Sequence, residues 1–116
     1  MFKTNKFHAK AVEYHGIKFA SLKERNRFKE LEMLNEGGII ANLEAHPVFM
    51  LNGSNGQPLR GENGRQLRYT ADFRYVDVAT GRTVVEDVKS RATKTQVYSL
   101  RKALVQNQYG IKIVEV

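Results

Sequence analysis

Hydrophobic and polar residues follow two different periods in the first third of the chain. Residues 10–19 contain two short strand-like runs around a central glycine, which predicts a small β-hairpin. Ser21 to Glu24 has the form of a capping box, with Ser as the N-cap and Glu as the third helical residue. A helical stripe follows and consists of Phe28, Leu31 and Leu34. With Gly37 as the stop, this pattern predicts a helix over residues 22–36.

The middle of the chain has the pattern of strands and turns. Residues 43–51 have the apolar content of a strand, in which Pro47 is tolerable only near the beginning or at an edge. Residues 52–64 are rich in Gly and Asn and predict a loop, and no internal repeat is evident. Residues 68–78 and 83–89 are rich in Val, Tyr, Phe and Thr, and predict the two strands of a hairpin.

Helical spacing returns near the C-terminus. The apolar stripe here consists of Val97, Leu100 and Leu104. It predicts a helix over residues 95–109 that stops at Gly110, followed by a strand over residues 111–116. Because the last strand follows a helix, we expect it to return by a right-handed crossover and to pair in parallel with a strand of the antiparallel meander. The prediction is an α/β fold with a mixed sheet flanked by two helices and an N-terminal β-hairpin.

Composition narrows the class of protein. A chain of 116 residues without a linker predicts a single domain over residues 1–116, with residues 1–9 as a flexible basic N-terminus. The net charge of +7 favours a polyanionic partner such as nucleic acid, although a basic surface without a partner has the same charge. No apolar run is long enough to span a membrane and the start lacks a secretory signal, so we expect a cytoplasmic location.

Cysteine and histidine usage limits the chemistry. The absence of cysteine excludes disulfides, a thiol nucleophile and Cys-ligated zinc. His8, His15 and His46 are scattered without the spacing of metal ligands. We therefore expect any metal to be held largely by oxygen.

The predicted hairpin brings acidic and basic side chains to one face. A two-residue turn at Thr80-Gly81 gives paired residues whose numbers sum to 161, so that Arg74 lies opposite Asp87 and Asp72 opposite Lys89. Asp72 and Asp87 are then diagonal neighbours with Cβ atoms about 7–8 Å apart, a gap that two carboxylates can bridge through one divalent cation. The same residues also make an ordinary cross-strand ladder of ion pairs, each contributing about 1 kcal/mol or less.

Apolar neighbours favour a functional interpretation over the plain ladder. Val76, Val78 and Val85 share the charged face, so the charges lie at the margin of a core. Glu24 falls on the same helical stripe as Phe28 and therefore points inward. Glu24 also fits as a cap of the helix start, and the two roles can coexist.

Two short motifs resemble those of the PD-(D/E)XK nuclease superfamily. Thr70-Ala71-Asp72 is followed, after fourteen intervening residues, by Asp87-Val88-Lys89, and a Glu lies on the preceding helix. Ala71 stands where the superfamily motif has Pro, which spares the metal ligand. From residue 13 to 116 the chain is also similar to a family of small phage-encoded proteins of unassigned function placed in that superfamily. The resemblance implies a restriction-endonuclease-like αβββαβ core.

The resemblance also implies roles for individual residues. Asp72 and Asp87 would coordinate Mg²⁺, for which Mn²⁺ can substitute, the Val88 carbonyl would add a ligand, and Glu24 would complete or support the site. Lys89 would orient or deprotonate the attacking water. Residues expected to contact the nucleic-acid backbone are Arg74, Arg91, Lys94, Gln96, Arg101 and Lys102. Arg74 has no firm role, because it either balances the acidic cluster or contacts a phosphate.

Three functions follow, in decreasing order of fit. The first is a Mg²⁺-dependent endonuclease that hydrolyses DNA phosphodiester bonds, with branched or Holliday-junction DNA as the substrate favoured by analogy and a homodimer as the simple route to paired cuts. The second is a non-catalytic DNA-binding accessory protein of phage replication or packaging that retains the nuclease fold. The third is a basic structural protein of a nucleoprotein particle, without a metal site.

Overall fold

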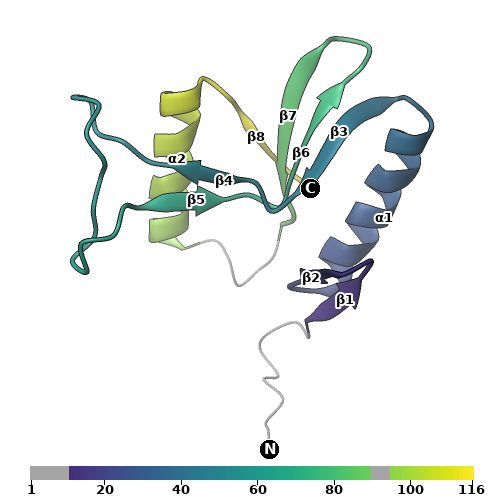
Figure 1. Cartoon of the computed structure of the whole chain (residues 1–116), viewed down its shortest axis with the longest axis horizontal. Helices are drawn as coiled ribbons and strands as arrows, with labels where there is room; N and C mark the ends of the chain where they lie inside the picture. Colours follow the sequence, from purple (N-terminus) through teal and green to yellow (C-terminus); the bar gives the residue numbers. More distant parts are fainter. Residues whose placement is uncertain (1–10, 90–94) are drawn as a thin grey trace, which may run out of the picture.

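The computed structural model describes residues 11–89 and 95–116, which form a mixed α/β fold (Figure 1). In chain order the elements are β1 (Val12–Tyr14), β2 (Ile17–Phe19), α1 (Leu22–Glu36), β3 (Ile40–Ala45), β4 (Val48–Met50), β5 (Arg68–Thr70), β6 (Phe73–Asp77), β7 (Arg82–Asp87), α2 (Gln96–Tyr109) and β8 (Ile113–Glu115). The predicted flexible tail, residues 1–9, lies outside the described residues. Within them, neither helix has the length and apolar composition needed to cross a membrane.

The N-terminal hairpin and the first helix form as the sequence predicts. β1 and β2 pair antiparallel, and α1 has the predicted bounds. Ser21 Oγ accepts a hydrogen bond of 3.1 Å from the Glu24 N–H, which satisfies one of the free amides at the helix start. Phe28 and Leu31 are buried, so the predicted apolar stripe is the face that packs.

The main sheet has the strand order β3-β6-β7-β8. β6 is antiparallel to both β3 and β7, and β8 returns from α2 to lie parallel to β7, as predicted. Phe73 of β6 packs with Phe28 of α1, whereas Val85 of β7 packs with Val105 of α2. Because neighbouring residues on a strand point to opposite faces, α1 and α2 cover the two faces of the sheet (Figure 1).

The strand predicted at residues 43–51 is two strands in two different sheets. His46 separates β3 from β4 in a left-handed conformation with φ of 56°, and Pro47 has no N–H with which to continue a ladder. The strand predicted at residues 68–78 also breaks, at Ala71 and Asp72, between β5 and β6. β4 and β5 therefore leave the main sheet and pair with each other.

The predicted register of the β6–β7 hairpin is wrong by two residues. Paired residues have numbers that sum to 159, because Asp77 rather than Ala79 faces Arg82. The longer turn is stabilised by Asp77 Oδ1, which accepts from the Ala79 N–H at 3.0 Å, and by Thr80 Oγ1, which accepts from the Arg82 N–H at 3.2 Å. Arg74 consequently faces Val85, and the predicted ladder of ion pairs does not form.

The second helix forms where predicted but buries a different face. Thr95 is its N-cap and Gly110, at φ of 65°, its C-cap. Val97 and Leu100 are 60% and 61% exposed, so the predicted stripe is wrong at these positions. Val105 is buried instead, because the helix turns its polar-tipped Tyr98 and Lys102 toward two acids on the sheet, the buried Asp87 and the half-buried Glu115.

Residues 48–70, which comprise β4, β5 and the turns between them, form what we call the arm. In Figure 1 the arm extends away from the main sheet and crosses in front of α2. Phe49, Leu51 and Tyr69 from its base share a core cluster with Val105 of α2. The tip is polar and exposed.

The arm contains two copies of an eight-residue unit, so the prediction that no repeat is evident is wrong. Residues 51–58 and 59–66 share Leu, Gly, Asn and Gly at their first, third, fifth and sixth positions. In each copy the first Gly donates its N–H to the carbonyl four residues on, at 2.7 and 2.9 Å, and the second Gly has φ of 81° or 82°. The two turns are therefore equivalent in conformation as well as in sequence.

Three leucines at intervals of eight residues close the repeat into a ring. The backbone N–H of Leu51 donates to Leu67, that of Leu67 to Leu59 and that of Leu59 to Leu51, at 3.0, 2.7 and 3.1 Å. Leu51 is fully buried, and the other two pack against the same cluster. Spacing of eight matches neither a helix nor a strand, which is why periodicity does not detect this element.

Candidate metal centre

Glu24, His46 and Asp72 bring three ligand atoms together at the centre of the molecule. One carboxylate oxygen from each acid and one imidazole nitrogen of the histidine all lie within 4.8 Å of one another. The residues come from the first turn of α1, from the β3–β4 junction and from the β5–β6 junction. We call these three residues the central cluster.

Glu24 is held by the start of α1. Its side chain is 7% exposed, and its Oε1 lies 2.9 Å from His46 Nε2 and 3.4 Å from the Ala20 N–H. The Ala20 contact replaces the bond to the N-cap amide that a capping box normally has. Glu24 therefore points inward, as predicted, while its backbone N–H completes the cap on Ser21.

The sequence does not identify His46 as part of the site. Its backbone N–H donates to the Asp72 carbonyl at 2.9 Å, so a single hydrogen bond joins two residues of the central cluster. The ring is partly exposed and lies 5.7 Å from that of Phe19, centroid to centroid. The available sequence signal was a His directly before Pro47, at the point where a strand must end, but such a position carries no chemical signature by itself.

Asp72 is held at the end of the sheet by backbone groups. Its Oδ2 accepts a hydrogen bond of 2.6 Å from the Val88 N–H, and its own N–H donates to Asp87 Oδ1 and to the Glu86 carbonyl at 3.1 Å. Burial, followed by the negative charge and the hydrogen bond of Glu24, raises the pKa of Asp72 to about 8. Glu24 and Asp72 are thus two acids that crowd one site.

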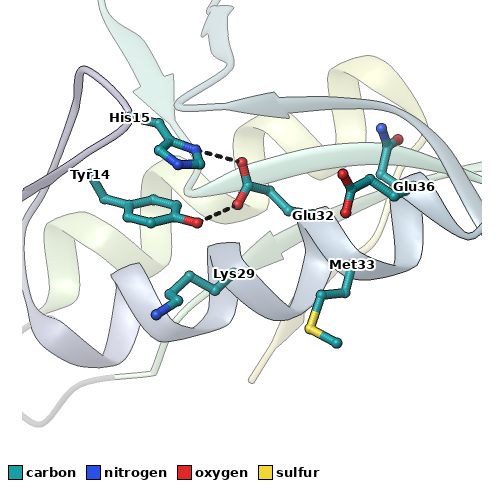
Figure 2. A pocket seen from close by; sticks show the side chains of 7 residues that line it. Tyr14, His15, Lys29, Glu32, Met33 and Glu36 are labelled. Atoms are coloured by element: carbon teal, nitrogen blue, oxygen red, sulfur yellow. Dashed lines mark hydrogen bonds and ion pairs between the residues drawn. The ribbon is translucent and has the colours of Figure 1, made fainter.

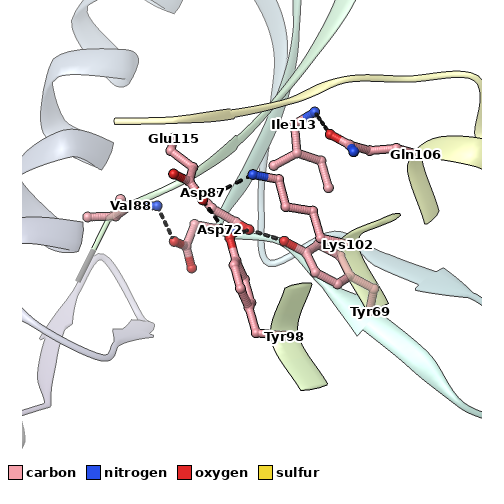
Figure 3. Close-up of polar contacts among 9 residues, drawn as sticks. All are labelled: Tyr69, Asp72, Asp87, Val88, Tyr98, Lys102, Gln106, Ile113 and Glu115. Carbon is pink, nitrogen blue, oxygen red and sulfur yellow. Dashed lines mark hydrogen bonds and ion pairs between the residues drawn. The ribbon is translucent and has the colours of Figure 1, made fainter. Parts of the chain in front are cut away.

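Asp87 lies behind Asp72 and faces α2 (Figure 3). Its carboxylate is buried, and it accepts hydrogen bonds from the Asp72 N–H, from the Tyr98 hydroxyl at 2.8 Å and from the Tyr69 hydroxyl. Burial and the bond to Asp87 raise the pKa of both Tyr69 and Tyr98 above the usual range, so these phenols stay protonated as donors. The structure therefore brings Asp87 next to Asp72, but its carboxylate binds the two tyrosines and is not part of the central cluster.

Val88 and Lys89 continue β7 along the edge of β8. The Val88 N–H serves Asp72, and the Lys89 N–H donates to the Val116 carbonyl at 2.7 Å. The Lys89 carbonyl accepts a bond of 2.8 Å from Lys23 Nζ of α1. The Lys89 side chain is exposed, and within residues 11–89 and 95–116 no hydrogen bond or ion pair fixes its ammonium.

The predicted backbone-contacting residues are spread over several elements. Arg74 pairs with Glu44 of β3 at 2.6 Å, and Lys102 pairs with Glu115 of β8 at 3.0 Å. Arg101 donates to the Arg68 carbonyl at 3.3 Å, at the base of the arm. Gln96 is exposed at the start of α2, while Arg91 and Lys94 lie outside the described residues.

Glu86, the neighbour of Asp87 on β7, is a buried acid on the opposite face of the sheet. Glu86 is 1% exposed and accepts hydrogen bonds from Arg27 Nε and Nη2, at 2.9 and 2.7 Å, and from the Tyr75 hydroxyl. The hydrogen bonds with Glu86 raise the pKa of Arg27 above its already high usual value. This acid is neutralised by its partner, as expected for a structural ion pair.

A third polar group joins the N-terminal hairpin to α1 (Figure 2). Glu32 accepts from the Tyr14 hydroxyl at 2.9 Å and lies 3.1 Å from His15 Nδ1. Because both contacts of Glu32 are with residues at the end of β1, the arrangement explains how the hairpin docks on α1.

Comparison with known proteins places the chain in a family. A family model described as "Protein of unknown function (DUF1064)" matches residues 4–114. The chain belongs to the DUF1064 family. No curated protein and no solved structure matches this DUF1064 chain. The match neither supports nor contradicts the nuclease superfamily, which remains a prediction.

Proposed function

We propose that the protein is a metal-dependent endonuclease that hydrolyses DNA phosphodiester bonds. The observation that carries the proposal is the central cluster, in which two carboxylates and an imidazole lie within 4.8 Å of one another. The PD-(D/E)XK resemblance independently selects Glu24 and Asp72, and the net charge of +7 suits a polyanionic substrate. The helix–three strands–helix–strand order of the main sheet is the order that a restriction-endonuclease-like core requires.

The donor set fits a divalent cation. Carboxylates and water suit Mg²⁺ and Mn²⁺, and the imidazole nitrogen of His46 favours a transition-metal ion, of which Mn²⁺ is one, over Mg²⁺. Such an ion would polarise a phosphoryl oxygen and lower the pKa of bound water. Glu24, His46 and Asp72 would hold it, and the positive charge of a bound cation would offset the burial and the nearby Glu24 that raise the pKa of Asp72.

Other residues of the chain have supporting roles in this proposal. Asp87, held by Tyr69 and Tyr98, fixes the backbone of Asp72 and so orients its carboxylate. Lys89 either supplies positive charge where the phosphate becomes more negative or takes a proton from the water. The dependence of the cleavage rate on pH separates these two roles.

The test compares cleavage by matched aspartate variants. Wild type, Asp72→Asn, Asp87→Asn and Asp77→Asn are incubated with linear, single-stranded, nicked and four-way-junction DNA in Mg²⁺, Mn²⁺ or chelator. We expect metal-dependent cutting that is lost in Asp72→Asn, reduced in Asp87→Asn and kept in Asp77→Asn, whose acid lies in the β6–β7 turn. Cutting that is equal in wild type and Asp72→Asn would contradict the proposal. The substrate ranking tests the preference for branched DNA.

The metal and the oligomeric state have their own readouts. Addition of Mn²⁺ is expected to raise the melting temperature of wild type, with a smaller rise in His46→Gln. Light scattering that gives a stable monomer while both strands of a duplex are cut would remove the proposed homodimer.

One observation favours a second function, a DNA-binding accessory protein without catalysis. Asp87, which the resemblance makes a metal ligand, already accepts three hydrogen bonds and is not one of the three residues of the central cluster. DNA binding that is equal in wild type and Asp72→Asn, without cutting in any metal, would support this alternative.

A further inference from the structure

The arm begins and ends at the central cluster. His46 and Pro47 directly precede β4, and Ala71 and Asp72 directly follow β5. Two backbone hydrogen bonds close the base: His46 N–H to the Asp72 carbonyl at 2.9 Å, and Ala71 N–H to the Pro47 carbonyl at 3.1 Å. The direction of the arm is therefore fixed relative to the residues that would hold a metal.

Side chains of α2 hold the arm from its other side. Gln108 accepts from the Asn52 N–H at 2.8 Å and donates to the Met50 carbonyl at 3.0 Å. The Tyr109 hydroxyl donates to the same Met50 carbonyl at 2.8 Å. Together with the ring of leucines, these contacts make the arm a preorganised projection.

The arm carries a positive charge at exposed positions. Residues 48–70 include Arg60, Arg65 and Arg68 against one acid, Glu62, which gives 3 − 1 = +2. All four of these side chains are exposed. Arg60 Nη1 binds the Gly64 carbonyl at 2.8 Å, and for Arg65 and Arg68 no side-chain hydrogen bond or ion pair occurs within the part of the chain that the structure describes.

The outer face of the two strands matches a groove of a double helix. Val48 and Met50 of β4, 49% and 39% exposed, pair across the ladder with Thr70 and Arg68 of β5. A two-stranded β-ribbon is narrow enough to enter the major groove, where apolar side chains contact thymine methyl groups and Arg contacts bases or phosphates.

We propose that the arm docks in a groove of double-stranded DNA, with Arg65 and Arg68 on the phosphates, and thereby presents the DNA backbone to the central cluster. The role given to this docking, presenting DNA to the metal site, rests on the proposed function. The binding of DNA by the arm does not itself require cleavage. Positive charge with an apolar centre on a rigid ribbon favours a duplex over a protein partner.

The test measures duplex binding in chelator, where no cleavage occurs. Anisotropy of a fluorescent duplex is followed over a salt series for wild type, Arg65→Ala/Arg68→Ala and a matched control, Lys18→Ala/Arg82→Ala. Lys18 and Arg82 are also exposed basic residues, on β2 and at the start of β7. We expect the arm variant to bind more weakly and to lower the slope of log K against log salt by about 2, one for each phosphate contact. The control should retain most of the wild-type slope.

A charge-preserving variant distinguishes loss of phosphate contacts from a general disturbance of the fold. Arg65→Lys/Arg68→Lys keeps the phosphate charge, so its salt slope should stay near that of wild type. An arm variant with wild-type affinity and slope, or an equal loss in the arm and control variants, would overturn the inference. A change in self-association with unchanged DNA binding would do the same and would identify the arm as a protein contact. Arm-dependent binding together with equal cleavage in wild type and Asp72→Asn would contradict the proposed function and still support docking by the arm.

Discussion

Two acidic sites border α1, and their negative charges are compensated to different degrees. Glu86 is matched by the guanidinium of Arg27, with two hydrogen bonds between them. Glu24 instead shares two neighbours: His46, 2.9 Å away, which carries a charge only when protonated, and a second acid, Asp72, whose pKa is raised to about 8 by burial and by Glu24. The first group is complete as a structural ion pair, whereas the second gains from an added positive charge. Burial alone therefore does not mark a site in this protein; incomplete compensation does.

The largest effect is expected when the compensated group is broken. Arg27→Ala leaves Glu86, 1% exposed, without its countercharge. Because an uncompensated buried charge is costly, we expect the free energy of unfolding to fall by about 3–5 kcal/mol. Urea denaturation measures this fall. The control is Lys29→Ala, on the same helix as Arg27. It removes a cation 5.5 Å from the centre of the Tyr14 ring and should lower the free energy of unfolding by about 1 kcal/mol or less.

The double variant Arg27→Met/Glu86→Gln sharpens the result. It removes both charges together and should recover much of the stability lost in Arg27→Ala. A loss below about 1 kcal/mol in Arg27→Ala would mean that Glu86 takes up a proton at little cost, and the contrast between the two groups would disappear.

A smaller effect, of opposite sign, is expected in the crowded group. Asp72 has an ordinary pKa of 3.8 in the unfolded chain and about 8 in the folded one. The folded state therefore binds the extra proton between these values, so the stability from this group is present below about pH 4 and is lost as the pH rises through about 8. Asp72→Asn mimics the protonated acid and avoids this loss. In chelator, its stability relative to wild type should rise by up to about 4 kcal/mol between about pH 5 and about pH 9.

Denaturation at several pH values measures this difference, and two controls define its origin. Asp77→Asn should follow the wild-type dependence on pH, since Asp77 lies in the β6–β7 turn. Saturating Mn²⁺ at high pH should stabilise wild type and so shrink the advantage of Asp72→Asn. A pH dependence identical in wild type and Asp72→Asn would show that Asp72 ionises freely and that the cluster is not crowded.

The sequence predicted local elements better than long-range relations. Both helices have the predicted bounds to within one residue, because their caps, Ser21, Thr95 and Gly110, are local signals. The hairpin register failed because side-chain bonds of Asp77 and Thr80 favour a longer turn. The exposed Val97 shows a further limit, since apolar spacing does not reveal which face a helix buries when polar groups must also be satisfied.

The candidate site was predicted in the parts that depend on a single element. Glu24 was predicted to point inward from its place on the helical stripe, and the structure confirms this direction. His46 joins the cluster through a break in β3–β4 and a tertiary hydrogen bond, which no local pattern encodes. The direction of Asp87 is likewise set by Tyr69 and Tyr98, two residues that only the packing of the arm and α2 brings together.

The smallest effect is expected for an exposed ion pair. Its coupling energy is the reference against which the two sites at α1 are compared. Arg74 and Glu44 face each other across β6 and β3, with side chains 36% and 48% exposed and an N–O distance of 2.6 Å. A double-mutant cycle with Arg74→Ala and Glu44→Ala should give a coupling energy of about 0.2–1 kcal/mol, because water and salt screen the pair. The coupling should weaken further as salt is raised. Urea denaturation of the four proteins provides the cycle. A coupling of about 3 kcal/mol that resists salt would place this pair with Arg27 and Glu86, and exposure would no longer separate the charges that stabilise the fold from those free to bind a ligand.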